Sequence, residues 1–192
     1  MQYTYETFMA LVDTILPRTP SLAYLYGEVM YYGALDFYTD EYLVMMLQFN
    51  NIPTDKITAD FINFVATQYM FMKEGYHWRI PQRVTFASLS LEDRFGVLNQ
   101  LDKYETYFFE AFIPLQNYSG SLSITSTLDR YTMLGYYSEW FGYGSTRLLE
   151  PSQRTLEFNP QSWQQVNYPG PSFSYLSSVK EYYAIRKQTI IP

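Results

Sequence analysis

The chain has 192 residues, no cysteine and a formal charge of −6 at pH 7. A chain of this length forms a single domain that needs neither a disulfide nor a metal for its stability. The missing cysteines exclude disulfides, zinc–thiolate sites, iron–sulfur clusters and thiol nucleophiles. Residues 1–55 hold seven acids and one base, which disfavours nucleic acid and anionic lipid as partners.

Aromatic residues make up a fifth of the chain, with 21 Tyr, 14 Phe and 3 Trp. Tyrosine is rarely buried completely and is enriched at protein interfaces, where its ring packs and its hydroxyl finds a partner. One small core cannot bury all of these tyrosines, so we expect part of the surface to contact another protein.

The first expected helix has an apolar face formed by Phe8, Leu11, Val12 and Ile15. Pro17 ends this helix, because its ring clashes with the preceding turn and it has no N–H group. A turn over residues 22–32 follows, with Ser21 as its expected cap.

Residues 34–49 predict a long helix that is apolar almost all round and therefore central. Its face is formed by Leu35, Tyr38, Tyr42, Met45 and Met46, and Phe37, Leu43 and Leu47 widen it. Thr54 is the expected N-cap of the next helix, over residues 55–73. Its inward residues are expected to be Ile57, Phe61, Phe64, Val65 and Phe71.

Ser90-Leu-Glu-Asp93 is a capping motif that predicts another helix start, with acids in the first turn. A further helix is expected over residues 123–137, and a last short one over residues 177–187. Between them, residues 140–175 contain many prolines and glycines but are too aromatic for disorder. We therefore predict an all-α fold, an irregular bundle of about five to six helices. Residues 1–139 form its helical core, and residues 140–192 form an irregular C-terminal wrap in the same domain.

Catalytic and metal-binding patterns are weak. Glu74 and His77 have the Glu-x-x-His spacing of di-iron bundles, but such a site needs two of these motifs and the chain has one histidine. No Gly-x-Ser-x-Gly elbow supports His77 as the base of a catalytic triad. Asp36, Asp40 and Glu41 have the spacing of a solvated helix face. No Gly-x-Gly-x-x-Gly or Walker motif is present. We expect no catalytic residue, cofactor or metal.

The aromatic residues around the last core helix and in the irregular segment are the candidates for a partner interface. They are Tyr136, Tyr137, Trp140, Phe141, Tyr143, Tyr168, Pro169, Phe173 and Tyr175. Stacking on a ligand is the less favoured alternative for the aromatic run over residues 131–143. No run of 18 residues lacks polar side chains, so no membrane-spanning segment is expected. The chain starts without a signal peptide or twin-arginine pair, which favours a cytoplasmic or surface-assembled protein.

Several segments, in their order and spacing, resemble the gluconate 2-dehydrogenase subunit 3 family, the small subunit of membrane-associated sugar and polyol dehydrogenases. They are residues 8–20, Gly33-Ala-Leu-Asp36 with Glu41-Tyr-Leu-Val-Met-Met-Leu47, Leu89-Ser-Leu-Glu-Asp-Arg94, Leu134-Gly-Tyr-Tyr-Ser138 and Tyr168-Pro-Gly-Pro171. The resemblance implies an accessory protein that binds a large flavoprotein subunit and supports its export or maturation. The resemblance also implies that the large subunit binds the flavin and that electrons leave the complex through a cytochrome subunit. Family members usually begin with a twin-arginine signal, and this chain does not.

Two other classes stay open. The tyrosine excess also suits a protein that assembles with itself, for instance in a cell- or spore-surface layer or fibre. A small-molecule enzyme that uses His77 is the weakest alternative.

Overall fold

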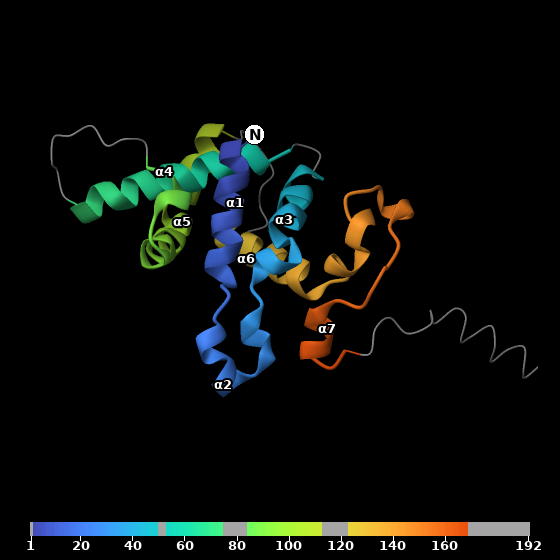
Figure 1. The fold of residues 1–192 in the computed structure, drawn as a ribbon. Helices are drawn as coiled ribbons and strands as arrows, with labels where there is room; N and C mark the ends of the chain where they lie inside the picture. The colour runs from blue at the N-terminus through green and yellow to red at the C-terminus, as the bar shows by residue number, and fades with distance from the viewer. Residues whose placement is uncertain (1, 50–52, 75–83, 113–122, 169–192) are drawn as a thin grey trace, which may run out of the picture.

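The computed structural model describes residues 2–49, 53–74, 84–112 and 123–168. This part of the chain contains seven α-helices and short 3-10 turns, and no strand (Figure 1). The all-α, irregular bundle predicted from the sequence is therefore confirmed. No helix in these four ranges is long and apolar enough to cross a membrane.

The central helix is the first one. Helix α1 contacts each of the four other long helices of the bundle, and in it Phe8, Leu11 and Val12 are fully buried, as the periodicity predicts. The bounds of the helices are α1 Gln2–Ile15, α2 Ala23–Tyr26, α3 Thr39–Gln48, α4 Asp55–Glu74, α5 Leu91–Phe112, α6 Ile124–Tyr137 and α7 Gln161–Gln165.

The continuous helix predicted over residues 34–49 is wrong, because the chain breaks it at Tyr38. A 3-10 turn, Ala34–Phe37, precedes Tyr38, whose φ of 53° and ψ of 36° are left-handed. Trp140 Nε1 donates a hydrogen bond of 2.8 Å to the Tyr38 carbonyl and so holds the break in place. Leu43 and Leu47, which the prediction placed on the edge of the apolar face, are buried in α3 together with Thr39 and Asp40. The predicted centre of that face, Tyr42, Met45 and Met46, is only half-buried.

Helix α4 has the predicted extent, but only one of its three predicted inward aromatic residues is buried. Phe61 and Val65 are fully buried, whereas Phe64 and Phe71 are 48% and 40% exposed. Phe61 and Val65 lie four residues apart on the face that meets the core, and Phe64 lies beside that face. The Thr54 hydroxyl donates to the Leu47 carbonyl over 3.2 Å instead of capping the helix.

Two helix starts are capped by serine side chains, and the first of these caps was predicted from the sequence. Ser90 Oγ accepts the Asp93 amide hydrogen over 3.2 Å and donates to the Asp93 carboxylate over 2.9 Å, so it closes the first turn of α5 from both sides. Ser123 caps α6 in the same way, by accepting the Ser126 amide hydrogen over 3.1 Å.

The buried amide of Asn63 joins three elements of the core. Its Nδ2 donates to Thr7 Oγ1 in α1 over 2.8 Å and to the Ala59 carbonyl in α4 over 2.7 Å. Its Oδ1 accepts the amide hydrogen of Phe86, in the 3-10 turn that precedes α5, over 2.7 Å. Both the nitrogen and the oxygen of the Asn63 side chain are thus hydrogen-bonded inside the apolar core.

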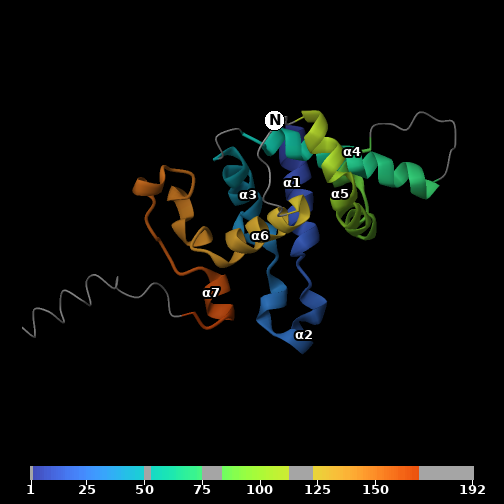
Figure 2. The same ribbon diagram turned by 180° about the vertical axis from the view of Figure 1, so that it is seen from behind.

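The segment after α6 follows the prediction of irregular structure as far as it is described. It contains the 3-10 turns Phe141–Thr146 and Pro151–Gln153 before α7. Figures 1 and 2 show this segment on the outer side of α3. The helix predicted over residues 177–187 lies outside the described residues.

Candidate functional site

A projecting arm carries the most exposed of the large apolar side chains in the described ranges, that of Tyr24. It comprises residues 17–33, between the end of α1 and the 3-10 turn that precedes α3, and it extends away from the body (Figure 1). Two backbone hydrogen bonds close its base, from the Thr19 amide to the Met30 carbonyl over 3.0 Å and from the Ala34 amide to the Leu16 carbonyl over 2.9 Å. Ser21 lies inside the turn Pro20–Leu22, where its side chain makes no capping bond.

Side chains reinforce the base of the arm. Arg18 forms an ion pair with Asp36, and Asp36 also accepts the Gly33 amide hydrogen over 2.8 Å. A Cβ atom at Gly33 would lie 2.7 Å from the Arg18 nitrogen and 2.9 Å from the Leu16 oxygen. Only glycine lets the two backbone segments approach this closely, so the base is a built and rigid junction.

The tip of the arm carries apolar side chains in contact with solvent. Tyr24 is 96% exposed, Leu25 69% and Tyr26 66%, and none of the residues from Pro20 to Tyr31 is buried. An exposed cluster of large apolar groups on an ordered element is typical of a protein-contact surface. We call the cluster formed by Leu22, Tyr24, Leu25, Tyr26 and Tyr31 the arm tip.

Two of the sequence-predicted interface residues belong to the core instead. Tyr136 is 2% exposed and Trp140 is 1% exposed, so neither ring is on the surface. The Tyr136 hydroxyl donates to the Tyr32 carbonyl at 3.4 Å and lies 3.3 Å from Gln165 Oε1, and burial raises its pKa to about 12. The two residues therefore fasten the C-terminal segment and the returning side of the arm to the body.

The other interface candidates are dispersed. Phe141 is half-buried, with its ring centroid 4.8 Å from that of Phe37. Tyr137 and Tyr168 are 41% and 47% exposed, and Tyr143 is half-buried. Pro169, Phe173 and Tyr175 lie outside the described residues. Tyr137 and Tyr168 are less exposed than Tyr24, Leu25 and Tyr26. The arm tip was not among the predicted interface candidates.

The three carboxylates expected on a solvated helix face are instead engaged inside the chain. Asp36 pairs with Arg18 at the arm base. Asp40 is 3% exposed and accepts a hydrogen bond from the Tyr5 hydroxyl, and burial is the main reason that its pKa is raised. Glu41 binds Arg147 of the C-terminal segment. The solvated-face interpretation is wrong for Asp40 and Glu41, which are buried and half-buried, whereas the contact between Asp36 and Arg18 is exposed.

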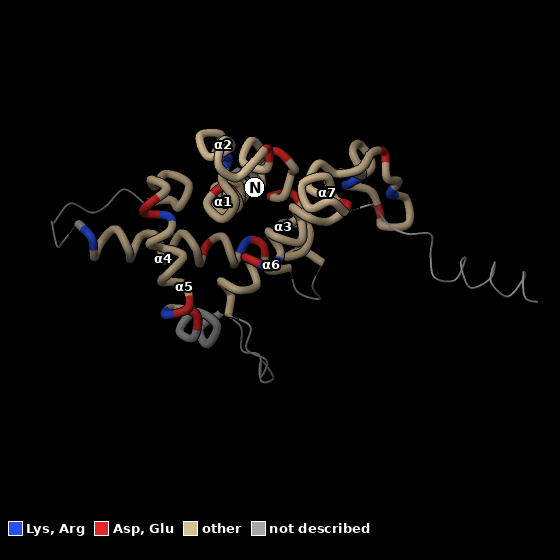
Figure 3. The backbone as a smooth tube through the Cα atoms, turned by 90° about the horizontal axis from the view of Figure 1, so that it is seen from below, with Lys and Arg blue, Asp and Glu red and all other residues tan. Residues whose placement is uncertain are grey.

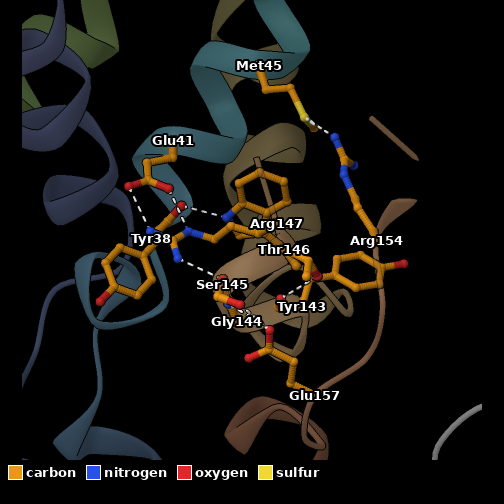
Figure 4. A network of polar contacts seen from close by, with 11 residues as sticks. Tyr38, Glu41, Met45, Tyr143, Gly144, Ser145, Thr146, Arg147, Arg154 and Glu157 are labelled. Atoms are coloured by element: carbon orange, nitrogen blue, oxygen red, sulfur yellow. Dashed lines mark hydrogen bonds and ion pairs between the residues drawn. The ribbon is translucent and has the colours of Figure 1, made fainter. Parts of the chain in front are cut away.

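Arg147 is the centre of the polar network between α3 and the C-terminal segment (Figure 4). Its Nε and Nη2 lie 2.7 and 3.1 Å from the two Glu41 oxygens, and its Nη1 donates to the Gly144 carbonyl over 2.8 Å. The guanidinium carbon is 3.9 Å from the ring centroid of Tyr38. These contacts anchor the C-terminal segment to α3, and the Arg147 donors that they use are paired with the Glu41 carboxylate and the Gly144 carbonyl.

Three of the seven acids in residues 1–55 form ion pairs within the described ranges, one with Arg18 of the same segment and two with arginines beyond it. Asp13 pairs with Arg94 of α5 over 3.5 Å, in addition to the Asp36 and Glu41 pairs. Figure 3 shows the acidic and basic positions of the described backbone spread over several elements. The acidic balance of residues 1–55 therefore serves folding as well as surface charge.

Nothing in the described ranges forms a group of three His, Asp or Glu residues that could hold a metal ion. His77, the candidate base and ligand, lies outside these ranges. Neither a protein-family model, nor a curated protein, nor a solved structure matches this chain. The structural features that point to a function are therefore the arm and the network around Arg147.

Proposed function

We propose that this chain is a non-catalytic accessory subunit that docks on a flavoprotein oxidoreductase and uses the arm tip for contact. The observation that carries the proposal is the exposure of Tyr24, Leu25 and Tyr26 on an arm whose base is rigid. The kind of partner comes from the resemblance to the gluconate 2-dehydrogenase subunit 3 family.

The energetics favour a protein partner for the arm tip. Burying one large apolar side chain contributes about 1.5–3 kcal/mol, so three such residues can supply the central energy of an interface. The backbone bonds at Thr19 and Ala34 order the arm in advance, which reduces the entropy lost on binding. Tyrosine is well suited to this position, because its ring packs while its hydroxyl stays hydrated.

A capture experiment tests the proposal. The tagged full chain is used to isolate complexes from its native source, and the eluate is examined for a large subunit with flavin absorbance. The arm variant combines Tyr24→Ser, Leu25→Ser and Tyr26→Ser. The control variant combines Phe64→Ser and Met72→Ser, which change exposed apolar residues of α4. We expect the native chain and the control to retain the flavoprotein and the arm variant to lose it.

Two results would contradict the proposal. The first is a capture that returns no flavoprotein. The second is a flavoprotein that the arm variant retains as well as the native chain does, which would leave the accessory role but remove the arm from it.

The alternative function is self-assembly into a surface layer or fibre, and the same exposed tyrosines of the arm tip favour it. Light scattering of the purified chain distinguishes the two functions. Polymers that the arm variant abolishes support self-assembly, whereas a monomer over a wide concentration range argues against it.

A further inference from the structure

A cleft of about 430 Å³ lies between α3 and the segment that follows Arg147. A second cavity of about 360 Å³ adjoins it and shares Met45, Phe49, Pro151 and Arg154 in its lining. Both volumes are in the range of small-molecule sites. The cleft has an apolar wall formed by Val44, Met45, Phe49, Leu148 and Leu149.

Arg154 is the charged residue that lines both cavities. Few of its N–H donors have a strong hydrogen-bond acceptor in the part of the chain that the structure describes. Its Nε donates to the Leu149 carbonyl over 2.9 Å, and its Nη2 contacts the Met45 sulfur at 3.1 Å (Figure 4). A thioether sulfur is a weak acceptor, and a guanidinium has five donors. Most of the Arg154 donors therefore lack a strong acceptor within the described residues.

The other arginines with described polar contacts differ from Arg154 in this respect. Arg18, Arg94 and Arg147 each pair with a carboxylate. Among the described residues, no carboxylate forms an ion pair with Arg154. Its guanidinium carbon lies 5.4 Å from the ring centroid of the buried Trp140, so the aromatic face below holds the group in position.

Three acidic residues, Glu41, Glu139 and Glu150, also line these cavities, and none of them forms a described ion pair with Arg154. Glu41 is bound by Arg147. Glu139 accepts the Tyr143 hydroxyl hydrogen over 3.0 Å. Glu150 is exposed and makes no described ion pair with Arg154. A half-buried guanidinium next to an apolar wall is complementary to a ligand that joins one carboxylate to a hydrocarbon body.

We propose that this cleft binds a small apolar monocarboxylate. The ligand carboxylate pairs with Arg154, and its hydrocarbon body lies against Met45, Phe49 and Leu149. The site is separate from the arm tip, so it would operate whichever partner the arm binds.

The experiment titrates the full chain, labelled in its methionine methyl groups, with 4-phenylbutyrate and with 4-phenylbutyramide. The amide matches the acid in size but has no charge. We expect saturable shifts of the Met45 methyl signal with the acid, and affinity about tenfold lower with the amide, because a charge-assisted hydrogen bond is lost. Arg154→Gln should lower the affinity for the acid by a similar factor, and Arg154→Lys should retain part of that affinity.

The control is Arg130→Gln, which removes an exposed arginine of α6 and should leave the affinity unchanged. Equal affinity for acid and amide would overturn the proposal, as would an Arg154→Gln variant that binds the acid like the native chain. Absence of saturable shifts with either probe would overturn it too. Thermal unfolding checks that each variant is folded. If a variant is not folded, the comparison of acid and amide binding to the native chain tests the proposal.

Discussion

Arg147 holds both carboxylate oxygens of Glu41 across 106 positions of the sequence. The side chains of Arg147 and Glu41 are only 18% and 17% exposed, so neither charge is well hydrated when its partner is lost. The pair is thus the principal polar link between α3 and the C-terminal segment.

Replacement of Arg147 by methionine should lower the free energy of unfolding by about 2–3 kcal/mol, because Glu41 is left partly buried without its partner. Urea denaturation measures the change. Arg130→Met removes an exposed arginine of α6 and should change stability by less than about 0.5 kcal/mol. Equal losses in the two variants would mean that the pair contributes no more than an ordinary surface charge.

Asn63→Ala should be among the most destabilising polar substitutions in the core. It leaves the Thr7 hydroxyl and the Phe86 amide without the partner that Asn63 supplies. Each buried group that loses its partner costs about 1–3 kcal/mol, so we expect a loss of about 2–4 kcal/mol in urea denaturation. The matched control is Asn99→Ala, on the exposed face of α5. A small loss at Asn63 would show that the three hydrogen bonds are not needed.

Gly33→Ala should weaken the base of the arm. The added Cβ meets two backbone atoms, the Arg18 nitrogen and the Leu16 oxygen, and backbone cannot move aside by changing a rotamer. We expect a loss of about 1–3 kcal/mol and faster cleavage by chymotrypsin at the arm tyrosines. Ser21→Ala, an exposed change within the arm, serves as the control. Unchanged cleavage of the Gly33→Ala chain would contradict the rigid junction.

The buried Asp40 should give stability a distinct pH dependence. Burial, reinforced by the neighbouring charge of Glu41, raises its pKa above the ordinary 3.8, while the Tyr5 hydroxyl opposes this increase by donating to the carboxylate. The folded chain then binds the Asp40 proton more tightly than the unfolded chain does. Its contribution to stability therefore falls as pH rises from 3.8 through the raised pKa, and stays at the lower level above it.

Asp40→Asn removes this titration and retains an acceptor for Tyr5. The difference in unfolding free energy between the variant and the native chain should increase with pH over that window, in favour of the variant. Glu92→Gln, at an exposed carboxylate of α5, tests whether the loss of any negative charge has the same effect. A difference that is flat with pH for Asp40→Asn would disprove the assignment.

Local sequence signals predicted most helix starts, faces and ends. The spacing of Phe8, Leu11 and Val12 gave the buried stripe of α1, and Ser90 with Asp93 gave the start of α5. These features depend on residues within a few positions of each other, so the sequence contains them directly.

The errors arose where distant residues decide the local structure. The break at Tyr38 is held by Trp140, 102 positions away, and apolar periodicity continues through it without a Gly or Pro. Asp40 and Glu41 look like solvated carboxylates until Tyr5 and Arg147 are placed beside them. The arm tip was missed because an apolar tyrosine-rich turn has the same composition whether it is buried or exposed.

The arm leaves the body after Leu16 and returns at Ala34, and these two residues are hydrogen-bonded to each other. The outer part of the arm, residues 20–27, has no buried residue and can change in sequence without disturbing the base, where Arg18, Tyr32 and Gly33 contact the body. A fluorescent label or a foreign epitope inserted between Tyr24 and Tyr26 would be presented to solvent by an undisturbed scaffold.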